Sequence, residues 1–183
     1  MIAARVKAPA TRSADPIQAS PLALQPELLQ AFLRLYGTLW SHGELDQATK
    51  EIARIRNART IDCPICKAIR FAGARQEGLG EDVIERVRDG YEHSDLTPRQ
   101  KLVLRTVDAF LSSPSELDSE LRRELLAHFT PAQIVELMAA LGLFMGFSKI
   151  TVALGGLPDK IPVHEQPTPT CPPPAASLRA EGR

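Results

Sequence analysis

The chain has 183 residues, which is enough for one domain with a sizeable core. Its 22 lysine and arginine residues balance 22 aspartate and glutamate residues, so the formal net charge is zero. Because nucleic acid and anionic membranes bind cationic surfaces, this balance argues against either of them as the main partner.

The three cysteines are too few for a structural disulfide framework, and the N-terminus lacks the continuous apolar core of a signal peptide. We therefore expect a cytoplasmic protein whose thiols are catalytic, redox-active, metal-binding or inert. A structural zinc site would need a second C-x-x-C or a paired set of histidines, and the histidines here are scattered. The sequence also lacks a glycine-rich phosphate loop, so it predicts no metal, flavin or nucleotide cofactor.

The first part of the chain is predicted to be an arm followed by two helices. Residues 1–24 carry prolines among small residues and no periodic apolar pattern, which predicts an extended arm. Pro26 opens a helix with apolar residues at helical spacing. Ser41 and Glu44 have the spacing of a capping box, which predicts a second helix from Leu45 to about Arg59.

Glu51 is the notable residue of this second helix. It lies beside Ile52 and Ile55 at the edge of the apolar face, so its carboxyl group can point at the start of the following helix. The alternative is a solvated helix glutamate that pairs with Arg54 or Arg59.

Cys63 and Cys66 form a C-x-x-C pair at the predicted start of a third helix, with Asp62 as the N-cap and Pro64 in the first turn. Thiols three residues apart can close a small disulfide ring, and the positive end of a helix dipole favours the thiolate. The dipole argument favours Cys63 as the thiol with the lower pKa. We interpret the pair as a redox or nucleophilic site. The alternative is two buried cysteines that only pack as small apolar residues.

The helix ends in the second half of the chain carry clear signals. Two four-residue motifs each combine a threonine cap, a proline at the first helical position and a glutamine at the third. They are Thr97-Pro98-Arg99-Gln100 and Thr130-Pro131-Ala132-Gln133. Glycines at 78 and 90 are typical C-terminal stops. The predicted helices are Cys63 to about Glu77, Glu81 to Arg88, one from Pro98, Ser115 to His128, and Pro131 to about Leu154.

The helix from Pro131 is apolar nearly all round, which predicts burial in the core or between subunits. Glu136, Ser148 and Lys149 interrupt it, so we do not expect it to span a membrane. The proline-rich remainder, 158–183, is predicted to be a disordered tail without helix or ladder. No stretch shows strand alternation, so the expected fold is all-α, a compact multi-helix bundle over residues 25–157.

These features resemble the alkylhydroperoxidase D-like proteins of the carboxymuconolactone decarboxylase superfamily over roughly residues 25–155. The active-site signature of that family is E-x11-C-x2-C-x3-H, and Glu51, Cys63 and Cys66 match it at the right distances. The final histidine is Arg70 here, and a histidine often found between the cysteines is Ile65. The resemblance implies the helical fold of that family and a homo-oligomer, a trimer or hexamer.

The resemblance further implies a thiol-dependent hydroperoxidase or disulfide oxidoreductase that acts on a small-molecule hydroperoxide. It assigns the attack on peroxide to Cys66, with Cys63 resolving to a disulfide that an external dithiol reduces. It also implies that Glu51 begins a proton relay, which reaches the thiols through water. The choice of Cys66 conflicts with the dipole argument, which favours Cys63.

Arg70 cannot replace the histidine as a base, because arginine stays protonated in proteins. On the helix face of Cys66 it could stabilise a thiolate, pair with Glu51 or bind a substrate carboxylate. The base would then be Glu51 or a histidine brought in by the fold, with His93 and His128 as candidates. Two other functions stay open: a decarboxylase or lactone-transforming enzyme in which Arg70 holds a carboxylate, and a non-catalytic oligomeric protein without the relay.

Overall fold

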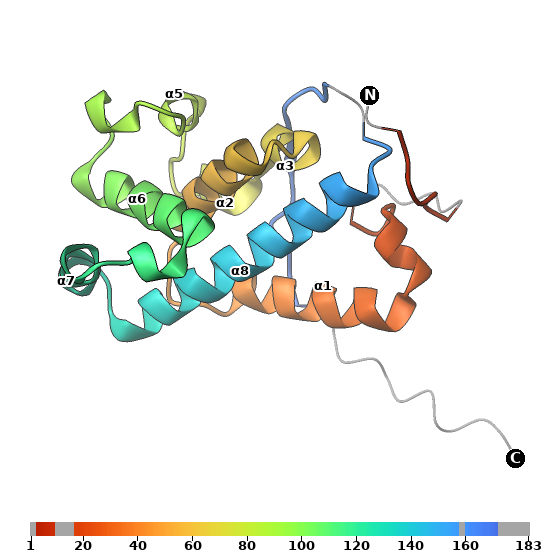
Figure 1. Cartoon of the computed structure of the whole chain (residues 1–183), viewed down its shortest axis with the longest axis horizontal. Helices are drawn as coiled ribbons and strands as arrows, with labels where there is room; N and C mark the ends of the chain where they lie inside the picture. The colour runs from red at the N-terminus through yellow and green to blue at the C-terminus, as the bar shows by residue number, and fades with distance from the viewer. Residues whose placement is uncertain (1–2, 10–16, 158–159, 172–183) are drawn as a thin grey trace, which may run out of the picture.

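The structure is a computed structural model that describes residues 3–9, 17–157 and 160–171. Most of these residues are helical, which confirms the expected fold class (Figure 1). The helices are α1 (Pro26–Ser41), α2 (Gln47–Ile61), α3 (Pro64–Ala68), α4 (Ala72–Gln76), α5 (Glu81–Arg86), α6 (Pro98–Ser112), α7 (Ser119–His128) and α8 (Pro131–Leu154), with 3-10 turns at Pro21–Leu24, Tyr91–His93 and Pro114–Glu116.

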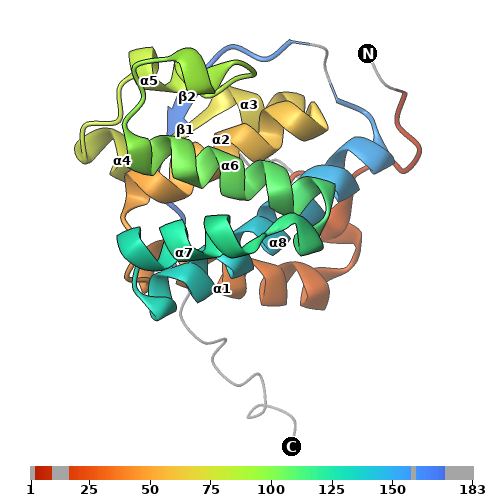
Figure 2. The ribbon, with the colours of Figure 1, turned by 60° about the vertical axis from the view of Figure 1, so that its left-hand side comes forward.

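Helix α2 forms the centre of the molecule, packed between α8 and α6 (Figures 1 and 2). Every residue from Thr49 to Ala58 is buried, including the charged ones. The apolar face expected for this helix is buried, and its charged side chains are buried as well, because they find partners inside the protein. Arg56, for example, donates to both carboxylate oxygens of Asp108, at 2.6 and 2.9 Å.

Side-chain caps begin α2, α6, α7 and α8, whereas α1, α3, α4 and α5 begin without one. Thr97 and Thr130 each accept the backbone N–H of the glutamine three residues later, and both predicted capping boxes are confirmed. The predicted box from Ser41 to Glu44 is wrong, because Ser41 is the last residue of α1. Asp46 caps α2 instead and accepts the N–H of Thr49 at 2.7 Å.

The helix predicted from Cys63 to Glu77 is broken into α3, the strand β1 (Ile69–Phe71) and α4. Asp62 is not its N-cap. It ends α2 in the left-handed conformation, with φ of 60°, and Cys63 occupies the N-cap position of α3. Chain reversal at Asp62 places Cys63 against the last turn of α2, where its N–H donates to the Ala58 carbonyl at 3.0 Å.

The strand β1 pairs in parallel with β2 (His164–Gln166), a segment that the sequence assigned to a disordered tail (Figure 2). The prediction that this part cannot form a ladder is wrong. Its prolines flank the three paired residues, so no ladder N–H is missing. Residues 158–159 and 172–183 of the predicted tail lie outside the described residues.

The predicted N-terminal arm is only partly covered by the structure, since residues 1–2 and 10–16 lie outside the described residues. The described part is attached to the helical body rather than simply extended. The N–H of Arg5 donates to the Leu154 carbonyl at 2.8 Å, at the end of α8. Pro21–Leu24 form a 3-10 turn, capped by the Ser20 hydroxyl.

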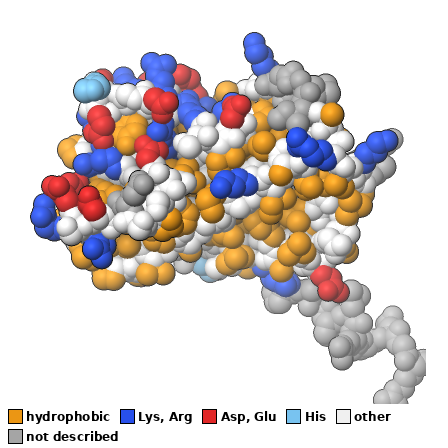
Figure 3. All heavy atoms as spheres, viewed as in Figure 1, with side chains coloured by type: hydrophobic (Ala, Val, Ile, Leu, Met, Phe, Trp, Pro, Cys, Tyr) orange, Lys and Arg blue, Asp and Glu red, His pale blue; other side chains and the backbone are white. Residues whose placement is uncertain are grey.

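Helix α8 begins and ends where the sequence predicted. By length and composition it could cross a membrane, so the argument from interrupting polar residues does not hold. One side of α8 packs into the core, where Leu137, Leu141 and Phe144 are buried beside α2. Only 33% of its most apolar stretch is buried within the chain. Exposed hydrophobic side chains remain over α1 and α8, where Figure 3 shows them gathered on one face; they include Leu28, Leu35, Val135 and Ile150.

Candidate active site

The two cysteines of the C-x-x-C pair lie together at the start of α3. The sulfur of Cys63 is 3.1 Å from the sulfur of Cys66, and both are thiols. Cys63 is fully buried, whereas Cys66 keeps 8% of its surface exposed and lines a cavity. Cys66 is therefore the thiol that a small molecule can reach.

The cation of this site is Arg54, a residue that sequence reasoning treated only as a possible surface partner of Glu51. Its side chain is 4% exposed and reaches from α2 to the cysteine segment. It donates to the backbone carbonyls of Cys66 at 2.8 Å and Ile69 at 2.7 Å. The sequence did not identify Arg54 as a site residue because it gave no sign that the whole of α2 is buried. That burial depends on contacts with α6 and α8, which are far away in the sequence.

Glu51 is 1% exposed and holds Arg54 in place. Its carboxylate accepts two hydrogen bonds from the Arg54 guanidinium, at 2.7 and 2.8 Å, and a third from the Phe71 N–H at 3.3 Å. The carboxylate thus points at the segment after α2, as the sequence suggested. It also pairs with Arg54, as the alternative suggested, but in the interior. These contacts fit the role of a positioning residue for Arg54.

The electrostatics of the site favour a thiolate on Cys66. The hydrogen bond from Cys63 lowers the pKa of Cys66 to about 7 against the opposing effect of burial, helped by the Arg54 charge and the Ser148 hydroxyl. That hydroxyl lies 3.5 Å from the Cys66 sulfur and accepts from the Asn57 amide at 3.1 Å.

The same hydrogen bond, together with burial, raises the pKa of Cys63. The contact between the sulfurs therefore favours Cys66 as the more acidic thiol, against the expectation from the helix dipole. An α3 of five residues has a weak dipole, and the direct contact between the sulfurs outweighs it. The position that the resemblance assigned to peroxide attack is the more acidic thiol.

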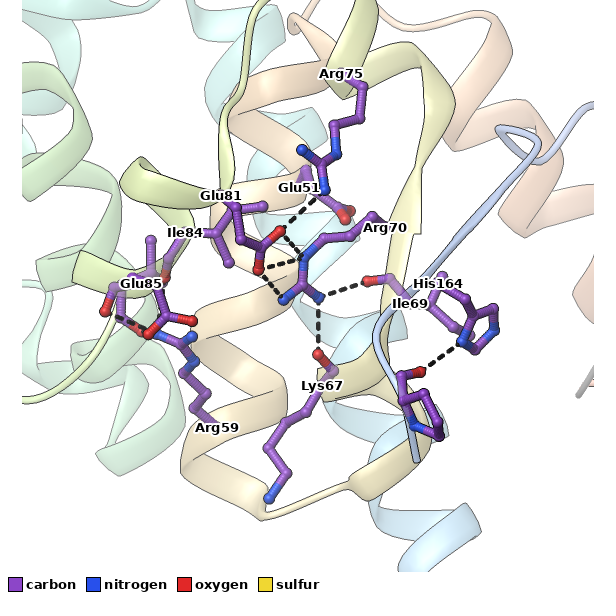
Figure 4. Close-up of polar contacts among 12 residues, drawn as sticks. Glu51, Arg59, Lys67, Ile69, Arg70, Arg75, Glu81, Ile84, Glu85 and His164 are labelled. Atoms are coloured by element: carbon purple, nitrogen blue, oxygen red, sulfur yellow. Dashed lines mark hydrogen bonds and ion pairs between the residues drawn. The ribbon is translucent and has the colours of Figure 1, made fainter. Parts of the chain in front are cut away.

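Arg70 is not beside the thiols. It lies on β1 rather than on the helix of Cys66, is 3% exposed, and directs its guanidinium at Glu81, with which it forms a 2.7 Å ion pair (Figure 4). It also donates to the carbonyls of Lys67 and Ile69. The expectation that it shares a face with Cys66 and stabilises the thiolate is wrong, and so is its suggested pairing with Glu51.

Arg70→His is accordingly expected not to accelerate any reaction of Cys66, although it restores the histidine of the family signature. It should instead lower the free energy of unfolding by about 1–3 kcal/mol, because the Glu81 ion pair and two carbonyl contacts are lost in a buried place. Urea unfolding and the rate of Cys66 alkylation measure the two effects. Arg75→His is the matched control, since Arg75 also pairs with Glu81 but is exposed. A faster Cys66 in Arg70→His would contradict this placement.

The histidines are distributed differently from the expectation. His93 and His128 lie in the turn Tyr91–His93 and at the end of α7, and neither lines the cavity at Cys66. His164, on β2, does line it. Its ring nitrogens lie 2.9 Å from the Pro162 carbonyl and 3.3 Å from the Gln166 amide. Sequence reasoning missed His164 because it placed this segment outside the fold.

The cavity at Cys66 has a volume of about 610 Å³, within the usual range of small-molecule sites. Helices α1, α3 and α8 and strand β1 supply apolar walls, among them Leu33, Ile65, Phe71 and Phe147. Tyr36 also lines it, and burial raises the pKa of its phenol, which stays protonated. Across residues 3–9, 17–157 and 160–171, no group of three His, Cys, Asp or Glu side chains could hold a metal ion.

Comparison with known proteins gives one family match. Residues 26–109 match the carboxymuconolactone decarboxylase family. The chain is also 29% identical over 111 residues to an uncharacterized protein, Rv2313c, of Mycobacterium tuberculosis. That match covers 61% of this chain but only 39% of the relative, so the chain spans about two-fifths of the relative's length.

Two solved structures share the fold, each with a TM-score of 0.64. One is an uncharacterized peroxidase-related protein from Silicibacter sp. TM1040, with 19% identity over 76% of this chain and 73% of that one. The other is a protein of unknown function, ATU0492, from Agrobacterium tumefaciens, described as a candidate antioxidant defence protein AhpD. Its identity is 22%, over 74% of this chain and 93% of that chain.

Proposed function

Because the chain belongs, through residues 26–109, to the carboxymuconolactone decarboxylase family, we propose that it is a thiol-dependent peroxidase that reduces organic hydroperoxides. One observation carries the proposal. The Cys66 sulfur, 3.1 Å from the resolving Cys63, opens on a cavity of about 610 Å³ and has a pKa lowered to about 7. The peroxidase-related and antioxidant descriptions of the two structural relatives point the same way.

In the first step the Cys66 thiolate attacks the hydrogen-bearing oxygen of the hydroperoxide. The O–O bond breaks, Cys66 becomes a sulfenic acid, and the second oxygen leaves as an alkoxide that takes up a proton. The neutral Tyr36 phenol lines the same cavity and can donate a hydrogen bond to this leaving oxygen. Apolar walls exclude water around the reacting atoms, which strengthens such contacts.

In the second step the Cys63 sulfur attacks the Cys66 sulfenic acid. An S–S bond forms, the S–O bond breaks, and water leaves with the hydroxyl group and the Cys63 proton. An external dithiol then reduces the disulfide by exchange and is itself oxidised. The 3.1 Å separation of the sulfurs lets the resolving step follow with little movement of the chain.

The site works without the histidine of the family signature. The contacts of Cys66 lower its pKa, so more of it is thiolate at neutral pH than for an ordinary thiol, and no dedicated base is needed to deprotonate it first. Glu51 then acts through Arg54, which its carboxylate orients toward the thiol segment. The decarboxylase alternative depended on Arg70 binding a substrate carboxylate. The Arg70 guanidinium pairs with Glu81 instead, so this argument for a decarboxylase no longer applies.

The test is a mass measurement on the reduced protein after one equivalent of cumene hydroperoxide. The peptide that contains Cys63 and Cys66 should lose two hydrogens, and a dithiol should restore them. The peptide with Cys171 is the internal control and should keep its mass. Oxidation at Cys171 alone, or no oxidation at all, would instead support the non-catalytic alternative.

A further inference from the structure

The segment 160–171, which we call the strap, forms one side of the cavity at Cys66. In Figure 1 it runs past α3 and down to α1, and Figure 2 shows the same course from another side. Every residue from His164 to Thr170 lines the cavity that Cys66 and Arg54 also line. The space open to a ligand of Cys66 is thus bounded by the helical body and by a segment about 95 residues later in the chain.

The strap is held to the body at three places. At its start, β2 pairs with β1, with Ile69 opposite His164. In the middle, the Gly73 N–H donates to the Thr168 hydroxyl at 2.7 Å. At its end, the backbone N–H of Cys171 donates to the Ser41 hydroxyl at 3.4 Å, on the last turn of α1. These contacts fix the distance between the strap and the apolar wall.

The strap is a wall only one chain thick. Most of its residues from 160 to 171 are exposed and the rest are only partly buried, so solvent lies on one side and the cavity on the other. The body side of the cavity is apolar, formed by residues such as Leu33, Ile65 and Phe147. A shift of the strap therefore changes the width of the cavity directly, without repacking of the core.

We propose that the strap is the specificity element of the thiol site, because it sets the largest reagent that can reach the Cys66 sulfur. Organic hydroperoxides that fit between the strap and the apolar wall react, and bulkier ones are excluded. The proposal rests on the proposed function only in taking Cys66 as the reacting thiol and hydroperoxides as its substrates.

One glycine allows the strap to be displaced by a minimal change. Gly37, on α1, faces the strap, and a Cβ atom there would overlap the Thr170 carbonyl and lie 2.7 Å from the Cys171 nitrogen. These are backbone atoms, so Gly37→Ala must push the strap away from α1. Gly142→Ala is the matched control: it is the same substitution inside a helix, and no atom lies within 4 Å of the added Cβ.

The experiment compares two maleimides of equal chemistry and different size, N-methylmaleimide and pyrenyl maleimide, on the full-length reduced protein. Peptide mass spectrometry follows alkylation of Cys66 over time. Gly37→Ala should raise the ratio of the bulky to the small rate constant by about tenfold, the scale on which one methylene changes discrimination in a pocket. Gly142→Ala should leave the ratio at the wild-type value. A ratio in folded Gly37→Ala equal to that of the wild type overturns the proposal.

Thr168→Val gives a second variant in case Gly37→Ala does not fold. It keeps the side-chain shape but removes the oxygen that accepts the Gly73 N–H. In Thr168→Val the ratio of the bulky to the small alkylation rate constant should also rise. If Gly37→Ala does not fold, an unchanged ratio in Thr168→Val overturns the proposal.

Parallel rates with hydrogen peroxide and cumene hydroperoxide separate this proposal from the proposed function. If the maleimide ratio rises while neither peroxide oxidises any variant, the strap controls access and the peroxidase assignment is wrong. If both peroxides oxidise Cys66 but the maleimide ratio stays constant, the peroxidase stands and the strap proposal fails.

Discussion

Cys66→Ser is expected to abolish oxidation of the site by hydroperoxides, with a rate lower by a factor of about 10³ or more, because a serine hydroxyl is a poor nucleophile. Cys63→Ser should keep the first step and stop at the sulfenic acid of Cys66. The serine hydroxyl at 63 can still donate to the Cys66 sulfur, so the thiolate stays stabilised. Stopped-flow rates and trapping of the sulfenic acid with dimedone, followed by mass spectrometry, distinguish the two variants.

Cys171→Ser serves as the control for this pair of variants, since Cys171 lies against Thr38 and Ser41 on α1 and does not line the cavity. It should react like the wild type. If Cys63→Ser were inert and Cys66→Ser formed a trapped sulfenic acid, the two thiols would have the opposite roles. The helix-dipole argument would then be right after all.

Arg54→Met is expected to lower the free energy of unfolding by about 3–5 kcal/mol, because it leaves the Glu51 carboxylate buried without its partner. It should also raise the pKa of Cys66 from about 7 toward the ordinary thiol value of about 8.5, because the guanidinium charge favours the thiolate. The thiol form then predominates at pH 7, so alkylation there slows. Urea unfolding and the pH dependence of iodoacetamide alkylation measure the two effects.

Two further variants make this prediction specific. The double variant Glu51→Gln with Arg54→Met removes both charges and should recover part of the lost stability, since no unpaired ion remains in the interior. Lys67→Met removes a half-exposed cation from α3 that pairs with the exposed Asp62, and it should change neither quantity measurably. If the double variant loses as much unfolding free energy as Arg54→Met alone, Arg54 contributes through packing rather than through its ion pair.

The parts of the fold that local chemistry determines could be predicted from the sequence. The helices that follow Thr97 and Thr130 begin where a hydroxyl, a proline and a glutamine satisfy the first free N–H groups, and such contacts reach only three residues along the chain. The closeness of Cys63 and Cys66 was predictable for the same reason, because both belong to one turn.

The break in the third helix was not predictable in this way. Ile69 and Phe71 adopt a strand because β2 supplies a ladder from a segment about 95 residues later, and no local pattern shows that partner. This strand turns Arg70 toward Glu81 and leaves the thiol segment to Arg54. The family signature therefore pointed to the correct segment of the chain, but the cation beside the thiols is Arg54 and not Arg70.

The position of the strap after the rest of the thiol site in the chain sets an order of events during protein synthesis. The residues of the thiol site, from Glu51 to Ser148, leave the ribosome before Thr170, which lies 22 positions after Ser148. At about 5–20 residues per second, the chain grows by these 22 positions in about 1–4 s, so the complete thiol site precedes the strap by that interval and the sulfur pair precedes it by longer. If the strap sets the size limit as proposed, newly made molecules pass through a stage in which oxidants of any size can reach the cysteines, and discrimination by size begins only once the strap has left the ribosome and folded.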